Sequence, residues 1–147
     1  MSTMAQPAPW FLYAIAAAVL YGAHQIFTRL AAEGIGEGIG SLVVESSAAA
    51  TILLYLAVLW AGGRWDQKIT AEGLAYSLLT GLCVGGGTIV FFLMFQRGGP
   101  LSAVPAILAG GAALMAVAGV VAFHEPITIQ RMAGVVMAIA GLLLLRS

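Results

Sequence analysis

Five apolar stretches, each long enough to cross a lipid bilayer, fill almost all of this 147-residue chain. A membrane-spanning helix needs about 20 mainly apolar residues, because each residue adds about 1.5 Å along the helix axis. Hydrophobic residues make up 61% of the sequence and charged residues 8%, whereas soluble domains carry about 25% charged residues. The sequence therefore predicts an all-α integral membrane protein. The predicted spans are about Trp10–Leu30, Ile39–Ala61, Leu74–Phe95, Leu101–Phe123 and Thr128–Leu145.

The basic residues of the short loops give no preferred orientation in the membrane. Five spans put the two termini on opposite sides, and an excess of Lys and Arg on one side normally decides which side is cytoplasmic. Here the two sides carry equal numbers, so dual topology is one prediction, and orientation set by a small imbalance or a partner chain is the alternative. The N-terminal side has Arg64, Lys68 and Arg131, and the C-terminal side has Arg29, Arg97 and Arg146.

A single five-helix unit is half of what many secondary transporters contain. Such transporters are built from two inverted repeats around a site near the bilayer midplane. We therefore predict completion by dimerisation, as a homodimer that is antiparallel if the chain inserts in both orientations. Small-residue ridges such as Gly81/Gly85 and Gly134/Gly141 allow helices to approach closely, although they suit packing within one subunit equally well.

The first span carries a polar stripe on one helical face. Tyr21, His24, Gln25 and Thr28 recur at i, i+3, i+4 and i+7, and such a stripe faces protein or water rather than lipid. We take all four as candidates for lining a substrate pathway. Histidine is the side chain that most readily exchanges protons near neutral pH, so His24 is a candidate for proton coupling. Its alternative role is an interhelical hydrogen bond.

Glu45 lies about two turns inside the second span. An ionisable residue within a span is by default a functional hypothesis, so Glu45 joins the pathway candidates and is a second candidate for proton coupling. The alternatives are that its side chain reaches the nearby interface or pairs with Arg29 or Arg97.

The third and fourth spans combine pathway candidates with weak points. Thr88, Phe91 and Phe95 share a face at i, i+3 and i+7, and could present a hydroxyl and two rings to a pathway or, for either ring, to lipid. Glycines weaken a helix by roughly 1 kcal/mol each relative to alanine, and a proline inside a helix leaves a carbonyl free. A close crossing or bend is therefore expected at the triple glycine. The helix-hinge candidates are Gly85, Gly86, Gly87, Pro105, Gly110 and Gly111.

The sequence lacks the residue sets that several kinds of chemistry require. The chain has two histidines, on different spans, and one cysteine, Cys83, so one chain assembles neither a zinc set nor a cysteine nucleophile. The glycine runs lack the Lys-Ser/Thr of a P-loop, and a net charge of zero gives no indication of nucleic-acid binding. We expect no enzyme activity, no cofactor, no metal site and no nucleic-acid partner.

The C-terminal third of the chain carries a family pattern. It contains Gly99-Pro100-Leu101-Ser102-Ala103, a long helix of small residues, Glu125, Gln130, Gly134, and a closing run from Ile139 through Gly141. This pattern resembles the end of an EamA-type repeat of the drug/metabolite transporter superfamily. Tyr21-Gly22 followed by Arg29-Leu30 is similar to the first helix of that repeat.

The resemblance implies that residues 1–147 form one EamA-like five-helix domain, whereas most members of the family have ten helices in two inverted halves. It implies export or exchange of small metabolites, such as amino acids or amphiphiles, through a cavity lined by the first, third and fourth helices. One departure is that a proline often found midway along the fourth helix is absent here, with Gly110-Gly111 near that place.

We therefore predict a homodimeric secondary transporter or facilitator that moves a small organic solute by alternating access. It would be a multi-pass protein of the cell membrane, placed in the bacterial inner membrane, with lipid, solute and a second copy as partners. The rival predictions are one subunit of a heteromeric transporter and a non-transporting membrane scaffold.

Overall fold

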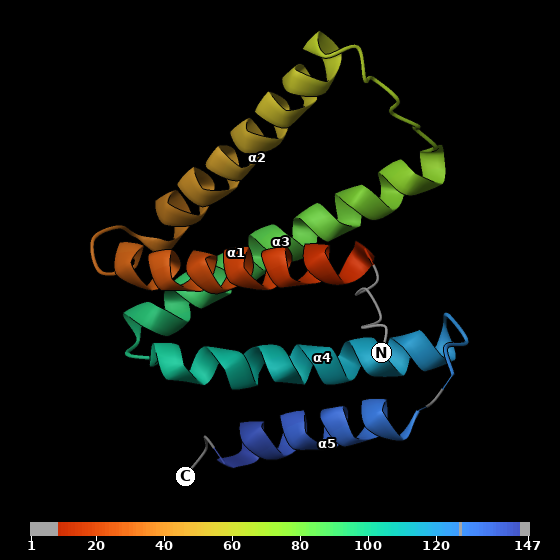
Figure 1. Ribbon diagram of the computed structural model, residues 1–147. Helices are drawn as coiled ribbons and strands as arrows, with labels where there is room; N and C mark the ends of the chain where they lie inside the picture. Colours follow the sequence, from red (N-terminus) through yellow and green to blue (C-terminus); the bar gives the residue numbers. More distant parts are fainter. Residues whose placement is uncertain (1–8, 127, 145–147) are drawn as a thin grey trace, which may run out of the picture. The chain divides into compact units, whose positions relative to one another are not determined.

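The computed structural model describes residues 9–126 and 128–144 of the chain. Every regular element in these residues is helical, so the prediction of an all-α protein is confirmed. The chain divides into two compact units, Met1–Gly98 (unit 1) and Gly99–Ser147 (unit 2). The helices, labelled in Figure 1, are α1 (Pro9–Ala31), α2 (Glu37–Ala61), α3 (Ala71–Gln96), α4 (Val104–Val121) with a preceding 3-10 turn (Leu101–Ala103), and α5 (Ile129–Leu144).

Four of the predicted spans are helices of membrane length. They cover Trp10–Ala31, Glu37–Ala61, Ala71–Gln96 and Leu101–Val121 and have the length and apolar composition to cross a bilayer. The helix α5 is also apolar but has 16 residues, or about 24 Å, against a hydrocarbon layer of about 30 Å. The predicted end of this span, Leu145, lies outside the described residues.

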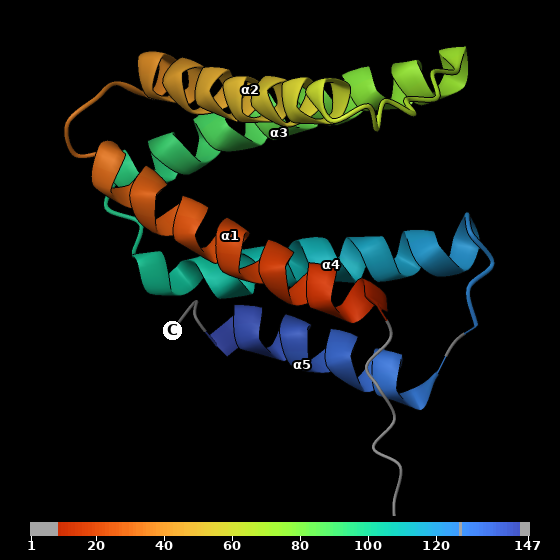
Figure 2. The ribbon, with the colours of Figure 1, turned by 45° about the horizontal axis from the view of Figure 1, so that its top comes forward.

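Unit 1 is held together at one end. In Figures 1 and 2 the last turns of α1, the start of α2 and the end of α3 lie at the same end of the unit, and α2 and α3 run antiparallel. Figure 1 shows α2 and α3 separating toward the loop of residues 62–70. That loop leads into α3 through Thr70, whose hydroxyl accepts a hydrogen bond from the Gly73 N–H at 3.1 Å, as an N-cap does.

The closest approach of α2 to α3 occurs at Gly40. A Cβ atom added to Gly40 would lie 2.5 Å from Cε1 of Phe92, whose side chain is fully buried. The sequence instead predicted a close crossing or bend at the triple glycine of residues 85–87. Helix α3 runs unbroken through Gly85, Gly86 and Gly87, and a Cβ at any of them would meet nothing within 4 Å. The expectation of a close crossing there is wrong for the described residues, because the packed part of α3 lies further toward its C-terminal end.

Unit 2 is an antiparallel hairpin of α4 and α5. Its connection folds back on α4: the Glu125 N–H donates to the Gly119 carbonyl at 3.0 Å, and a Cβ at Gly119 would lie 3.4 Å from the Glu125 carboxyl group. Pro105 occupies the first turn of α4, where an N–H has no helical acceptor in any case. The expectation that Pro105 frees a carbonyl within the helix is therefore wrong, because α4 begins at Val104. Helix α4 continues without a break through Gly110 and Gly111.

Candidate functional site

The packed end of unit 1 has a polar interior. Four polar side chains, from all three helices, are at least nine-tenths buried there, alongside a few apolar ones. Because a polar group costs free energy in hydrocarbon, spans place such groups against protein or a water-filled pathway. We refer to these four residues as the polar core: Gln25 (8% exposed), Thr28 (2%), Ser41 (4%) and Thr88 (4%).

Helix α1 supplies half of the polar core, from the end of its polar stripe. The Thr28 hydroxyl donates to the His24 carbonyl at 2.9 Å, a bond within its own helix. Within the described residues, Oε1 of Gln25 and Nδ1 of the half-buried His24 have no hydrogen-bond partner. Tyr21, one turn earlier, is 68% exposed and does not join the polar core. The predicted stripe is therefore buried at its C-terminal end only.

A hydrogen bond between side chains links α2 to α3. Oγ1 of Thr88 lies 2.6 Å from Oε1 of the half-buried Glu45 and donates to it, and it also lies 3.0 Å from the Val84 carbonyl of its own helix. Glu45 and Thr88 were separate candidates in the sequence. The fold brings them into contact although they lie 43 positions apart in the chain.

Arg29, one of the two cations proposed as partners for Glu45, is engaged elsewhere. Nη1 of Arg29 lies 2.6 Å from Oε1 of Glu33, one turn along the chain, and the guanidinium sits 5.9 Å from the centre of the Phe95 ring. Across the described parts of the chain, no ion pair joins Glu45 to a basic residue. The Glu45 carboxyl group instead accepts a hydrogen bond from Thr88 of α3.

Ser41 is the member of the polar core that sequence analysis missed. It lies one turn before Glu45 on α2, is 4% exposed, and its Oγ has no hydrogen-bond partner among the described residues. The i, i+4 spacing to Glu45 places the two on one helical face and could have identified it. Serine is common in spans, where it usually bonds its own backbone, so the residue type gave no signal.

The buried face of α3 differs by one residue from the expected face. Thr88, Phe92 and Phe95 are buried, at i, i+4 and i+7, whereas Phe91 is half-buried and lies against Phe95 with ring centroids 6.2 Å apart. The expected face used i+3 in place of i+4. A further bond, from Nε2 of Gln96 to the Ile35 carbonyl at 3.0 Å, fastens the end of α3 to the α1–α2 connection.

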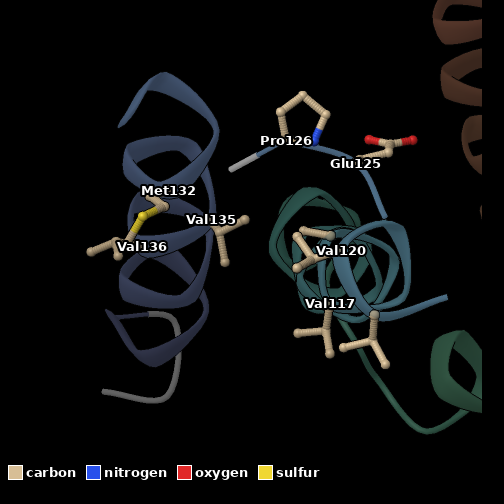
Figure 3. Close-up of a pocket in the computed structure, with 9 residues that line it drawn as sticks. Val117, Val120, Glu125, Pro126, Met132, Val135 and Val136 are labelled. Carbon is tan, nitrogen blue, oxygen red and sulfur yellow. The ribbon is translucent and has the colours of Figure 1, made fainter. Parts of the chain in front are cut away.

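Unit 2 contains an apolar pocket, and its described residues include no comparable set of buried polar side chains. The pocket has a volume of about 360 Å³. Figure 3 shows Val120 of α4 and Val135 of α5 pointing toward each other, with Pro126 at one end. The nine lining residues are Ala116, Val117, Val120, Val121, Glu125, Pro126, Met132, Val135 and Val136.

Residues 9–126 and 128–144 contain no group of three or more His, Cys, Asp or Glu side chains placed to hold a metal ion. The packed end of unit 1 thus places hydroxyl, amide and carboxyl groups between helices.

Comparison with known proteins identifies the family. The sequence matches the EamA-like transporter family over residues 8–147, nearly the whole chain. No curated protein and no solved structure matches it. The match agrees with the helical architecture, with four apolar helices of membrane length, and with polar groups buried between helices. This multi-pass membrane protein belongs to the EamA-like transporter family, within the drug/metabolite transporter superfamily.

Proposed function

We propose that this chain is a secondary transporter or facilitator that moves a small organic solute across the membrane as a dimer, by alternating access. Membership of the EamA-like transporter family supports transport as the general activity. The solute, the dimer and the mechanism are the parts that the proposal adds. We also propose that residues 1–147 act as one five-helix domain and that the membrane is a bacterial inner membrane.

The observation that carries the proposal is the polar core of unit 1. Inserting polar and ionisable groups into a membrane costs free energy, on the order of 2.5–3.5 kcal/mol for a charge at the centre of a span. A scaffold that only packs helices has no need of Glu45. Nor does it need the buried Gln25 Oε1 and Ser41 Oγ atoms, which have no hydrogen-bond partner among the described residues. A solute that forms hydrogen bonds with these atoms would satisfy them during its passage.

The parts of unit 1 away from the polar core support dimerisation. Beyond the packed end, α2 and α3 separate, and large apolar side chains on both are exposed, including Leu54 (66%) and Leu79 (57%). In a membrane these surfaces meet lipid or another protein. A transporter made of inverted repeats needs two repeats to enclose a pathway, so a second copy on these surfaces would complete it.

The residues of the polar core indicate a class of solute. Its hydroxyl and amide groups, together with the neighbouring carboxyl group of Glu45, suit a molecule with hydrogen-bonding groups and a small apolar part, such as an amino acid or an amphiphilic metabolite. The half-buried Phe91 adds an aromatic surface near the same end of α3.

Counterflow in proteoliposomes tests the proposal. Vesicles containing the full chain are loaded with a mixture of unlabelled amino acids and amphiphilic amines, and entry of each labelled compound is followed against protein-free vesicles. We expect saturable entry of at least one compound, reduced at least fivefold by Gln25→Leu and unchanged by Cys83→Ser, since Cys83 is exposed. No flux of any compound above the protein-free control would favour the scaffold instead.

The dimer is tested separately, in the same vesicles. Counting photobleaching steps of a fluorophore fused after Ser147 should give pairs of subunits at high dilution. In intact cells, paired reporters fused at the same position, one active in the cytoplasm and the other outside, then determine whether the chain inserts in both orientations, as an antiparallel pair requires. Single bleaching steps only, in vesicles that show flux, would overturn the dimer and leave transport standing.

A further inference from the structure

The connection between α1 and α2, residues 32–36, lies over one end of the polar core. It joins the last turn of α1 to the start of α2 at the packed end of unit 1 (Figures 1 and 2). Thr28 lies about one turn before the end of α1, and Ser41 lies about one turn after the start of α2. Both side chains are almost completely buried. A solute that leaves the polar core toward this side of the membrane therefore passes the connection.

The side chain of Ile35 closes this end of unit 1. A Cβ atom added to Gly40 would lie 3.1 Å from Cγ2 of Ile35 and 2.5 Å from Cε1 of Phe92, so the three residues meet at one point. Phe92 is fully buried and Ile35 is half-buried. Ser41 directly follows Gly40 in α2, so this apolar contact adjoins the polar core. Ile35 is therefore placed to shield the Ser41 hydroxyl from the side of the membrane that the connection faces.

A side-chain hydrogen bond holds the connection against α3. Nε2 of Gln96 donates to the Ile35 carbonyl at 3.0 Å, although the two residues are 61 positions apart. Arg29 adds an ion pair with Glu33 of the connection at 2.6 Å, and its guanidinium lies 5.9 Å from the centre of the Phe95 ring. An exposed hydrogen bond and a surface ion pair each contribute little net free energy. The connection is therefore held by contacts that break easily, in contrast to the buried packing of α2 against α3.

The closed arrangement does not require the two glycines of the connection. A Cβ atom at Gly34 or at Gly36 would meet nothing within 4 Å, and neither residue has a positive φ. Gly36 has φ −66° and ψ 151°, angles that any residue adopts. Packing therefore explains glycine at position 40 but not at positions 34 and 36. What glycine adds at these two positions is a range of backbone angles that other residues avoid, which a second arrangement of the connection can use.

We infer that the α1–α2 connection is a gate on one side of the polar core, closed in this structure by Ile35 and Gln96 and opened by rotation at Gly34 and Gly36. This inference rests on the proposed transport function and adds the step that connects the polar core with one side of the membrane. The described residues of unit 1 supply both the cover of the gate and the bond that holds it closed.

Opening of the gate changes few contacts. The bond between Gln96 and the Ile35 carbonyl breaks, and the Ile35 side chain leaves the Phe92 ring. Water and solute then reach Ser41 from this side. Phe92 remains packed against Gly40, so α2 and α3 stay together while the connection moves. The free Gln96 amide and Ile35 carbonyl both bind water in the open state, because this bond is exposed already in the closed state.

Labelling of a cysteine beneath the gate measures opening without requiring transport. In a Cys83→Ser background, Ser41→Cys reacts with a small maleimide in proteoliposomes without solute, and its labelling rate is compared with and without Gln96→Leu. The Gln96 bond exists only in the closed state, so its loss should raise the open population and the labelling rate by about three- to tenfold. Gln67→Leu, the same exchange at an exposed residue of the loop 62–70, is the matched control and should leave the rate unchanged.

Two further variants separate opening of the gate from a general loosening of unit 1. Gln96→Lys keeps an N–H donor on a side chain of sufficient length, so Ser41→Cys should be labelled at nearly the rate measured with Gln96 intact. Gly36→Ala fits the closed backbone and meets no neighbour, but it narrows the range of angles at the hinge. It should slow both the labelling of Ser41→Cys and solute flux by about two- to fivefold.

Three results would overturn the gate. They are equal labelling rates for Gln96→Leu and Gln67→Leu, equal acceleration by Gln96→Leu and Gln96→Lys, and labelling of Gly36→Ala as fast as with Gly36 intact. If solute flux is seen in proteoliposomes together with any of these results, the transport proposal stands and only the gate fails. If the labelling rates change as expected while no compound shows flux, the gate stands and the transport proposal fails.

Discussion

The two units of this chain pack their apolar helices in different ways. In unit 2, α4 and α5 lie side by side around an apolar pocket lined largely by valines. In unit 1, three helices meet around four buried polar side chains, and a carboxyl group on one helix bonds a hydroxyl on another. Without water inside the bilayer, apolar packing alone is enough to hold a helical hairpin. We propose that the polar groups of unit 1 have a role beyond packing, and this difference between the units can be tested.

The largest expected effect is on the stability of unit 1. Phe92→Ala removes a fully buried ring from the contact between α2 and α3 and should lower the free energy of unfolding by about 3–5 kcal/mol. The neighbouring Phe91→Ala is the matched control, and its half-buried ring should cost clearly less. Unfolding in mixed detergent micelles, followed by circular dichroism, measures both. Equal losses for the two variants would mean that Phe92 is not the packed member of the pair.

A smaller effect is expected at the closest helix contact. Gly40→Ala places a Cβ 2.5 Å from the Phe92 ring, and overpacking of this kind should cost about 1–3 kcal/mol. Gly38→Ala, on the same helix, meets nothing within 4 Å and should be neutral or slightly stabilising. The same unfolding measurement compares them. If Gly40→Ala is as stable as Gly38→Ala, α2 and α3 do not approach here in the membrane-embedded protein.

The polar contact should contribute less again to stability. Thr88→Val should lower the free energy of unfolding by about 0.5–1.5 kcal/mol, the net value of one hydrogen bond. A double-mutant cycle with Glu45→Ala isolates the interaction, and we expect a coupling energy of about 1 kcal/mol. A coupling energy near zero would show that the two residues do not interact.

The smallest effect is expected in unit 2. Val135→Ala removes two methyl groups beside an existing pocket, so it should lower stability by about 1 kcal/mol or less and leave solute flux within twofold of wild type. Counterflow and unfolding on the same preparation measure both quantities. A loss of flux larger than that caused by Gln25→Leu would place the transport pathway in unit 2 and reverse the comparison.

Much of the fold could be predicted from the sequence because the bilayer places one simple constraint on an apolar segment. Long apolar runs must be helical in a bilayer, since no other single segment satisfies its own backbone hydrogen bonds there. The start of α4 after a 3-10 turn was missed, because the apolar composition already begins in that turn.

For the candidate site, the sequence predicted individual residues but not the contacts between them. Polar residues stand out against apolar spans, so Gln25, Thr28, Glu45 and Thr88 were selected from the sequence. Which of them meet depends on how α1, α2 and α3 cross, and helical periodicity within one span says nothing about the rotation of its neighbour. For the same reason the sequence favoured Phe91 over Phe92, and the triple glycine over Gly40, as points of contact.

We propose that the solute passes along the polar core of unit 1. In a Cys83→Ser background, single cysteines at Ser41 and at Val120 are labelled with a small maleimide in proteoliposomes, with and without the transported solute. We predict that Ser41→Cys is labelled slowly and that saturating solute protects it at least fivefold, whereas the labelling of Val120→Cys does not change. Protection of Val120→Cys with none at Ser41→Cys would contradict the account and move the pathway to unit 2.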